Sequence, residues 1–265
     1  MPNISVTHSD SGLVRVIVRH REQVSPHIVR VTFGGKDLER FEYKGFDQWF
    51  RLAIPVRGDA GLHKMPTKFG IGGYLKYLTL PKGARPVIRN YTIRQFREHP
   101  AEMDVDFVVH GTDGVAGPWA ASVEPGAEVA FIDQGCGWDP VDAERCLIVA
   151  DESGMPAALG ILRDMPRDAR GTAIIETFDE SDQQFVNAPD GVNVRWVVRE
   201  AGEDPGVAAL PALKEEGISS DLYAFAVGES GLATGARRYL VGECGVPKAN
   251  VTFSGYWKLG KAAPS

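Results

Sequence analysis

The sequence predicts an antiparallel β-barrel of six strands followed by a parallel α/β domain. Up to about residue 140, short segments alternate apolar and polar residues and are separated by Gly, Pro and Asp, which is typical of antiparallel sheets. After Pro140, apolar strands alternate with helical segments, which indicates a parallel sheet covered on both faces. A chain of 265 residues is also longer than one hydrophobic core usually organises. We therefore expect two domains, at residues 1–140 and 141–265.

The strands of the first half are recognised by their alternation. Val14, Val16 and Val18 occupy every second position, and because successive side chains of a strand point to opposite faces, these three mark one buried face. A single helical segment, residues 117–125, precedes the last strand. The expected strands are residues 13–24, 27–35, 47–55, 87–96, 102–111 and 127–135.

The strands of the second half are continuous apolar runs instead. This pattern is expected because the strands of a parallel sheet are buried on both faces. Between two of these runs, Met155, Leu159 and Leu162 follow helical spacing. The expected strands are residues 146–151, 172–178, 193–200, 221–228 and 250–257, and the expected helices are residues 153–166, 206–217 and 231–245.

The composition excludes several classes of partner and location. The net charge is -6 and the pI is about 5.6, so we do not expect nucleic acid as a partner, because phosphate binding requires a basic face. The N-terminus lacks the features of a signal peptide and no uncharged run is long enough to cross a bilayer. We therefore expect a cytoplasmic protein without membrane insertion. Cys136, Cys146 and Cys244 fit no disulfide, zinc or iron–sulfur pattern, so no metal site is expected.

The segment Arg85–Phe96, RPVIRNYTIRQF, carries an unusual charge pattern for a strand. Arg89 and Arg94 flank Tyr91 and Thr92, whereas a strand that only fills a core does not place two guanidinium groups around an aromatic hydroxyl. Arg89, Tyr91 and Thr92 are therefore candidates for holding a ligand. Arg94 is expected at a solvated edge.

The segment HGTDGVAGPWAAS, residues 110–122, leads from a strand into a helix. Free N–H groups at a helix start, beside small residues that permit close approach, form an anion site. The alternative is an ordinary glycine-rich loop in which Pro118 starts the helix. His110 has no nucleophile and orienting acid beside it in the sequence, so we expect it to line a cofactor or cap a loop rather than transfer a proton.

The segment VADESGMPAAL, residues 149–159, is a second junction between a strand and a helix. In open parallel sheets, ligands bind beyond the carboxyl ends of the strands. Asp151 and Glu152 disfavour a phosphate lying directly on this junction, so we expect the nearby backbone to meet the ligand. Capping of the helix by Asp151 or Ser153 is the alternative interpretation.

Read together, these segments resemble the siderophore-interacting protein family, the flavin-dependent ferric-siderophore reductases of the ferredoxin-reductase-like superfamily. The resemblance runs in order over nearly the whole chain, and its most specific part is the ending Gly-Tyr-Trp-basic-x-Gly. Arg-x-Tyr-Thr/Ser alone would indicate only the wider flavoprotein group. The segments that carry the resemblance are RNYTIR, DFVVHG, GPWAAS, VADESGMPAALGIL, AVGES, RRYL and SGYWKLG.

The resemblance implies a Greek-key FAD-binding barrel at residues 1–140 and an NAD(P)H-binding α/β domain at residues 141–265. Tyr91 would lie against the isoalloxazine ring or ribityl chain, Arg89 would pair with the pyrophosphate, and Thr92 would reach the flavin. The remaining FAD-binding residues implied by the resemblance are Asp106, Val108, His110, Gly117, Pro118, Trp119 and Ala120.

The resemblance also implies residues that bind the electron donor. The choice between NADH and NADPH stays open, because Arg199, Arg237 and Arg238 could meet a 2′-phosphate, whereas Glu229 and Glu243 stand in the same region. The expected NAD(P)H-binding residues are Asp151, Glu152, Ser153, Pro156 and Glu229.

Basic residues near the flavin attract the anionic ferric chelate in this family, and Arg51 and Lys258 occupy two such places. Many members carry a further basic residue where this chain has Gly135, Cys136 and Gly137, which leaves the preferred siderophore open. We expect a monomeric NAD(P)H:ferric-siderophore oxidoreductase, with ferredoxin as an alternative redox partner. The competing hypotheses are a reductase of ferredoxin or free flavin and a siderophore-binding protein without enzymatic activity.

Overall fold

The computed structural model describes residues 4, 12–55, 60–65, 77, 79–81, 85–109 and 114–261. They form two compact units. One unit contains the described residues from 12 to 44 and from 48 to 135, and the other contains residues 4, 45–47 and 136–261.

The first unit is an antiparallel sheet of seven strands in the order β4-β3-β7-β1-β2-β6-β5. Its strands are β1 (Leu13–Ser25), β2 (Ile28–Gly34), β3 (Trp49–Ile54), β4 (Val87–Thr92), β5 (Gln95–Glu98), β6 (Ala101–Val108) and β7 (Glu128–Gly135). Besides a short 3-10 helix (Lys36–Arg40), the unit has helices α1 (Ala60–His63) and α3 (Ala116–Ser122). The antiparallel architecture is confirmed, but the strand expected at residues 87–96 is divided into β4 and β5.

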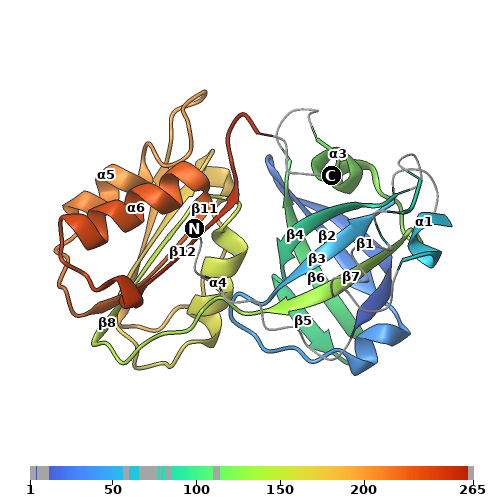
Figure 1. Ribbon diagram of the computed structural model, residues 1–265, viewed down its shortest axis with the longest axis horizontal. Helices are drawn as coiled ribbons and strands as arrows, with labels where there is room; N and C mark the ends of the chain where they lie inside the picture. The colour runs from blue at the N-terminus through green and yellow to red at the C-terminus, as the bar shows by residue number, and fades with distance from the viewer. Residues whose placement is uncertain are drawn as a thin grey trace. The chain divides into compact units, whose positions relative to one another are not determined.

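The division between β4 and β5 closes the sheet into a barrel, visible in Figure 1. These two strands are its opposite edges, yet only two residues separate them in the chain. The N–H of Ile93 donates to the carbonyl of Gln48 next to β3, and the N–H of Arg94 donates to the carbonyl of Asp104 in β6, each at 2.9 Å. The sheet must therefore curl so that its two edge strands approach each other at this corner.

The barrel core follows the expected alternation of β1. Val14, Val16 and Val18 are at most 2% exposed and pack with the fully buried rings of Phe33 and Phe107. Burying one such side chain contributes roughly 1.5–3 kcal/mol relative to leaving it in water. The alternation thus identifies the residues that hold the barrel together.

The second unit is a parallel sheet in the order β10-β9-β8-β11-β12. Its strands are β8 (Arg145–Ala150), β9 (Gly171–Thr177), β10 (Val192–Val198), β11 (Leu222–Glu229) and β12 (Val251–Trp257). Its α-helices are α4 (Met155–Asp164), α5 (Ala209–Glu215) and α6 (Ser230–Gly242), with 3-10 helices at Glu180–Asp182 and Lys248–Asn250. Every expected strand and helix of this half is present.

The order of the second sheet determines where a ligand would bind. The chain runs from β8 through β9 to β10 on one side, and β11 and β12 lie on the other side of β8. Because crossovers are right-handed, this reversal places α4 on the face opposite α5 and α6, as Figure 1 shows. In open sheets of this kind, the ligand crevice lies at the carboxyl ends of the strands where the order reverses.

Residues 45–47 pack on the parallel-sheet unit although they precede β3. The Asp47 carboxylate accepts hydrogen bonds from the N–H groups of Gly137 and Trp138, each at 2.9 Å. Phe46 donates its N–H to Asp164 at 2.6 Å, and a Cβ on Gly160 would lie 2.1 Å from the Phe46 carbonyl oxygen. Glycine at position 160 is therefore required for this contact.

No helix among the described residues is long and apolar enough to cross a bilayer.

Candidate functional site

The barrel places Arg89 and Tyr91 on one face of β4. Each lies opposite a buried residue of β3, since Arg89 pairs with Leu52 and Tyr91 with Phe50. Both β4 side chains are only half-buried, and one terminal nitrogen of Arg89 donates to the Ile88 carbonyl at 2.8 Å. A guanidinium and a phenol thus stand side by side at the border between core and solvent.

The Tyr91 ring rests on the barrel core through Phe107. The two ring centroids lie 4.3 Å apart, and the Phe107 ring lies 5.6 Å from that of Trp119 in α3. Burial raises the pKa of Tyr91, and the nearby Arg89 charge acts in the opposite direction. The phenol therefore stays protonated and can donate a hydrogen bond. Among the residues that the structure describes, its hydroxyl has no hydrogen-bond partner.

Helix α3 begins close to the end of β6. A Cβ on Gly117 would lie 3.5 Å from the Val108 carbonyl oxygen, so the first turn of the helix approaches the strand. Val115 is the N-cap residue, and its side chain accepts no hydrogen bond from the helix. N–H groups at such a helix start can bind a phosphate oxygen.

Two of the expected FAD residues serve the barrel itself. Trp119 stacks on Phe33 with their centroids 6.4 Å apart, which places the indole against the core. Asp106 is bound by both Nε and a terminal nitrogen of Arg30, at 2.6 and 2.8 Å. Arg94 lies 3.8 Å from the same carboxylate and is only 15% exposed, so the expectation that it sits at a solvated edge is wrong.

The other expected residues of the first half differ in how far they are exposed. Thr92 is buried opposite Trp49, and Ala120 is a fully buried residue of α3. Pro118 lies in the first turn of α3 and is half-buried. Arg51 is exposed on β3 opposite Asn90, and His110 lies outside the described residues.

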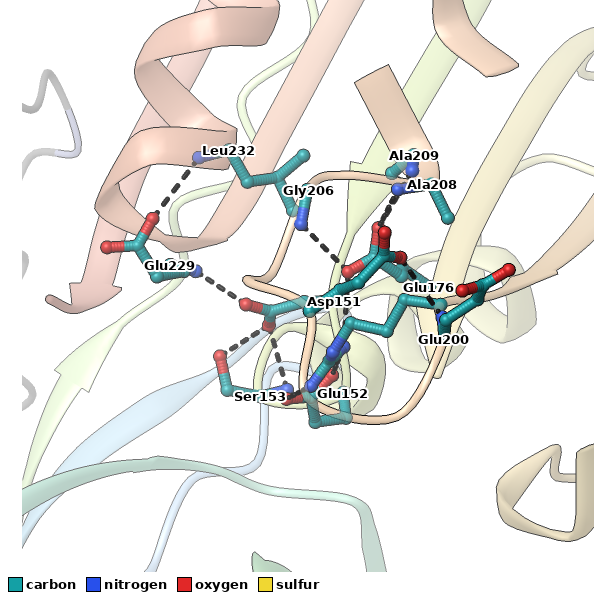
Figure 2. Close-up of polar contacts among 12 residues, drawn as sticks. Asp151, Glu152, Ser153, Glu176, Glu200, Gly206, Ala208, Ala209, Glu229 and Leu232 are labelled. Atoms are coloured by element: carbon teal, nitrogen blue, oxygen red, sulfur yellow. Dashed lines mark hydrogen bonds and ion pairs between the residues drawn. The ribbon is translucent and has the colours of Figure 1, made fainter. Parts of the chain in front are cut away.

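In the parallel-sheet unit, the Asp151 carboxylate organises the junction between β8 and α4 (Figure 2). One oxygen accepts from the N–H and hydroxyl of Ser153, at 2.8 and 2.6 Å, and from the N–H of Gly154 at 3.1 Å. The other accepts from the N–H of Glu229 at 2.6 Å. Burial raises the pKa of Asp151. These bonds hold the turn before α4, whose N-cap residue is Gly154, and Pro156 is buried in the first turn of the helix.

Glu152 follows Asp151 in the chain, and its carboxylate is bound by Arg199. The two terminal nitrogens of Arg199 lie 2.7 and 2.8 Å from the two carboxylate oxygens. Burial raises the pKa of Glu152 to about 7 even though Arg199 acts in the opposite direction. The guanidinium also lies 4.1 Å over the Phe178 ring. Arg199 is therefore enclosed and cannot offer its charge to a ligand.

Glu176 is the second acid bound to Arg199, at 3.1 Å, and the sequence reading missed it. Its carboxylate accepts from the N–H groups of Gly206, Ala208 and Ala209, at 2.8, 3.0 and 2.8 Å, and so caps the start of α5 (Figure 2). The sequence does contain a signal for it, since this acid lies inside the apolar run TAIIETF. A carboxylate buried in such a strand requires hydrogen-bond or ion-pair partners.

Both carboxylate oxygens of Glu229 also accept hydrogen bonds from the protein. One carboxylate oxygen accepts from the N–H groups of Gly231 and Leu232 at the start of α6, and the other accepts from the N–H of Leu259 at 3.1 Å. Ser230 adds a hydrogen bond from its hydroxyl to the Trp257 carbonyl at 2.7 Å. The start of α6 is thereby attached to the turn that carries Lys258.

A cavity of about 550 Å³ lies beside this attachment, within the parallel-sheet unit. Lys258 is exposed and lines it. The described residues that line it are Asp204, Pro205, Glu229, Ser230, Gly231, Thr234, Arg238, Lys258 and Leu259.

Comparisons with known proteins agree with this arrangement. The model of the siderophore-interacting FAD-binding domain matches residues 17–137, and that of the siderophore-interacting protein matches residues 143–260. The ferric vibriobactin reductase ViuB of Vibrio cholerae is 30% identical over 91% of this chain and 88% of its own length. The NADPH-dependent ferric-chelate reductase of Escherichia coli is 31% identical over 68% of each chain.

Solved structures show the same fold. The siderophore-interacting protein SipS of Aeromonas hydrophila superposes with a TM-score of 0.77 at 28% identity, over 95% of this chain and 93% of its own. A ferredoxin-NADP+ reductase from Plasmodium falciparum has a TM-score of 0.63 at 12% identity, over 96% of this chain and 100% of its own. At that identity the second likeness concerns the fold alone, which is ferredoxin-reductase-like.

Proposed function

The chain belongs to the siderophore-interacting protein family, and from that premise we propose that it is an FAD-dependent ferric-siderophore reductase that takes its electrons from a nicotinamide dinucleotide. Residues 1–140 would bind FAD and residues 141–265 would bind the donor. The observation that carries the proposal is the placement of Arg89 and Tyr91 on one face of β4, in contact through Phe107 with the helix that starts at Ala116.

The residues of the barrel suit the diphosphate and ring of FAD. A guanidinium binds phosphate oxygens through paired N–H groups, which suits Arg89 for the diphosphate. The first turn of α3, which contains Gly117, would supply further backbone donors. Tyr91 offers a ring face and a protonated hydroxyl without a partner among the described residues. Bound FAD would allow a donor of two electrons to reduce an acceptor that takes one electron at a time.

In the parallel-sheet unit, we propose that the expected acidic residues hold the backbone of the donor site. Asp151, Glu152 and Glu229 all direct their carboxylates at protein groups, so we assign them to holding the backbone at the ends of β8 and β11. Of the other expected donor-binding residues, Ser153 is half-buried with its hydroxyl bonded to Asp151, and Pro156 is buried. The ion pair with Arg199 neutralises Glu152, whereas Asp151 and Glu229 are held by backbone N–H groups.

Arg51 and Lys258 supply positive charge for the anionic ferric chelate. Both are exposed, and neither has an ion-pair partner within the described parts of the chain. An unpaired exposed cation raises the local concentration of anionic substrate and speeds its encounter. Hard oxygen ligands bind Fe(II) less tightly than Fe(III), so reduction of the chelate releases its iron without a protein metal site.

Anaerobic stopped flow tests the proposal directly. The FAD-loaded protein is mixed first with NADH or NADPH and then with a panel of ferric siderophores, a ferredoxin and free flavin. Reduction of the bound flavin by a nicotinamide, followed by its reoxidation by a ferric siderophore faster than by the other acceptors, is expected. If no ferric siderophore reoxidises the flavin, the reductase assignment fails.

A further inference from the structure

The turn that carries Lys258 is attached to the start of α6 on both sides of this lysine. Before it, the carbonyl of Trp257 accepts a hydrogen bond from the Ser230 hydroxyl at 2.7 Å. After it, the N–H of Leu259 donates to the Glu229 carboxylate at 3.1 Å. Exposed turns are usually more mobile than the elements they connect. Here two side chains fix the backbone at the positions next to the lysine.

The turn is also closed by its own backbone. The N–H of Lys261 donates to the carbonyl of Lys258 at 3.1 Å, and Gly260 between them has a φ of 71°. Glycine adopts this left-handed conformation without the steric cost that other residues meet. The backbone of Lys258 is therefore determined both by the closure of the turn and by its attachment to α6.

A glycine in β12 permits the attachment. A Cβ on Gly255 would lie 2.9 Å from the Cα of Ser230, so only glycine lets the start of α6 lie this close to the strand. On the other side, the N–H of Glu229 donates to the buried Asp151 carboxylate at 2.6 Å. The segments AVGES and SGYWKLG are thus joined into one unit that is held from β8.

The attachment leaves the charge of Lys258 available. The second carboxylate oxygen of Glu229 accepts from the N–H groups of Gly231 and Leu232, where the positive end of the helix dipole offsets its charge. Lys258 is exposed, and its ammonium group has no ion-pair partner within the part of the chain that the structure describes. Glu229 therefore binds the backbone of the turn without pairing with its cation.

We infer that Glu229 and Ser230 are positioning residues that hold Lys258 in the place from which it attracts the anionic ferric chelate. The inference rests on the proposed function, which supplies the chelate as substrate. A cation held in one place loses little freedom when it binds an anion, so the attachment favours binding of the chelate. When the turn is detached, Lys258 spends less time in this place, and the apparent affinity for the chelate falls by the same fraction.

Two variants detach the turn in different ways. Glu229→Asp shortens the side chain by one methylene, so it no longer reaches Leu259, whereas aspartate remains a favoured N-cap residue for α6. Ser230→Ala removes the hydroxyl that binds the other side of the turn. Glu243→Asp makes the same shortening at an exposed position after α6. Thr234→Val removes a hydroxyl that donates to carbonyls of α6 itself. The last two variants are the matched controls.

Amide hydrogen exchange, followed by mass spectrometry, tests the attachment without flavin chemistry. Glu229→Asp and Ser230→Ala raise the exchange rate of residues 257–261 roughly threefold to tenfold, as expected for the loss of one hydrogen bond. The control variants exchange at the rate of the parent protein. Unchanged exchange in both detaching variants would overturn the inference.

Anaerobic stopped flow separates the two halves of the reaction in the FAD-loaded protein. In both detaching variants the apparent dissociation constant of the ferric chelate rises roughly threefold to tenfold. The rate of flavin reoxidation at saturating chelate and the rate of flavin reduction by a nicotinamide stay at the parent values. A variant that only destabilises the fold would instead change both halves.

A double-mutant cycle connects the effect to the lysine. In a Lys258→Gln protein, Glu229→Asp causes no further change in the affinity for the chelate, because no cation is left to position. If the two substitutions act additively, Glu229 affects the chelate independently of Lys258 and the inference is overturned.

The possible failures are distinguishable. If ferric chelates reoxidise the flavin of the parent protein but Glu229→Asp alters only its reduction by the nicotinamide, Glu229 serves the donor, so the inference is overturned and the proposed function stands. If no ferric chelate reoxidises the flavin of the parent protein, the proposed function fails and the positioning role fails with it.

Discussion

Arg199 binds Glu152 with both of its terminal nitrogens, at 2.7 and 2.8 Å, and the two side chains are 4% and 1% exposed. The same guanidinium lies 3.1 Å from Glu176, which is fully buried. Removing one partner from such a group leaves charges without compensation inside the protein, which is more costly than the pair itself is favourable. The stability of the parallel-sheet unit therefore depends strongly on Arg199.

Arg199→Met is expected to lower the free energy of unfolding by roughly 3–5 kcal/mol, because Glu152 and Glu176 lose their shared cation. Urea denaturation of both proteins measures the difference. Arg195→Met is the matched control, since Arg195 pairs with Glu215 at the surface and such pairs contribute about 1 kcal/mol or less. Equal losses in the two variants would contradict the prediction.

Asp47 is expected to make stability depend on pH. Burial raises its pKa to about 6, so the folded state holds a proton that the unfolded chain, with an ordinary pKa near 3.8, releases. The free energy of unfolding then falls as the pH rises from about 4 to 6, by up to roughly 3 kcal/mol from this group. Asp47→Asn removes this dependence, so its stability relative to the parent protein rises over that interval.

Urea denaturation at about pH 4 and about pH 7, below and above most of this change, measures the effect of Asp47→Asn. Asp139→Asn, at an exposed position nearby, serves as the control and is expected to leave the pH profile unchanged. A constant difference between Asp47→Asn and the parent protein at both pH values would rule the prediction out.

Gly228 is expected to tolerate no side chain. Its φ of 127° disfavours other residues, and an added Cβ would lie 2.5 Å from the Asp151 carboxyl carbon. Gly228→Ala should therefore cost roughly 3 kcal/mol or more, since it adds backbone strain and displaces a buried carboxylate from its donors. Gly242→Ala in α6 meets nothing within 4 Å and should stabilise by about 0.4–1 kcal/mol. Thermal and urea unfolding compare the two, and similar effects would refute the distinction.

Lys258→Glu is expected to slow the reoxidation of reduced flavin by anionic chelates roughly tenfold, because it reverses a charge that attracts them. Flavin content should stay unchanged. Lys261→Glu, in the same exposed turn, makes the same change of charge and should have the smaller effect. Single-turnover stopped flow at two ionic strengths measures both. Unchanged chelate kinetics in Lys258→Glu would remove this lysine from the chelate site.

Arg89→Ala is expected to weaken FAD binding at least roughly tenfold, since it removes a guanidinium proposed to bind the diphosphate. Titration of the flavin-free protein with FAD, followed by flavin fluorescence, gives the dissociation constants. Arg19→Ala, an exposed position on β1, removes the same charge from the barrel and is the control. The same FAD affinity in both variants would exclude Arg89 from the site.

The order of strands and helices could be predicted because hydrophobic periodicity is local. Val14, Val16 and Val18 reveal β1 without reference to any partner strand. The corner between β4 and β5 could not be seen in this way, because Ile93 continues the apolar pattern through it and is fully buried. The corner depends on the pairing of Arg94 with Asp104, which lies in another strand.

The candidate site was predictable in its position but less so in the role of each side chain. The motifs located the junctions at β4, α3 and α4. However, the sequence could not show that Arg199 is enclosed, because its partners Glu152 and Glu176 lie 47 and 23 residues away. For the same reason the sequence could not show that the Glu229 carboxylate accepts a hydrogen bond from Leu259, 30 residues further on.

The packing of residues 45–47 has a consequence for any attempt to divide this protein. A fragment that begins at residue 136 would contain the whole parallel sheet but not Asp47, and the N–H groups of Gly137 and Trp138 would lose their acceptor. A fragment that ends at residue 135 would carry Phe46 away from Gly160 and Asp164. A single cleavage between the two compact units therefore damages one of them, and separate expression would require residues 45–47 to be supplied to the second fragment.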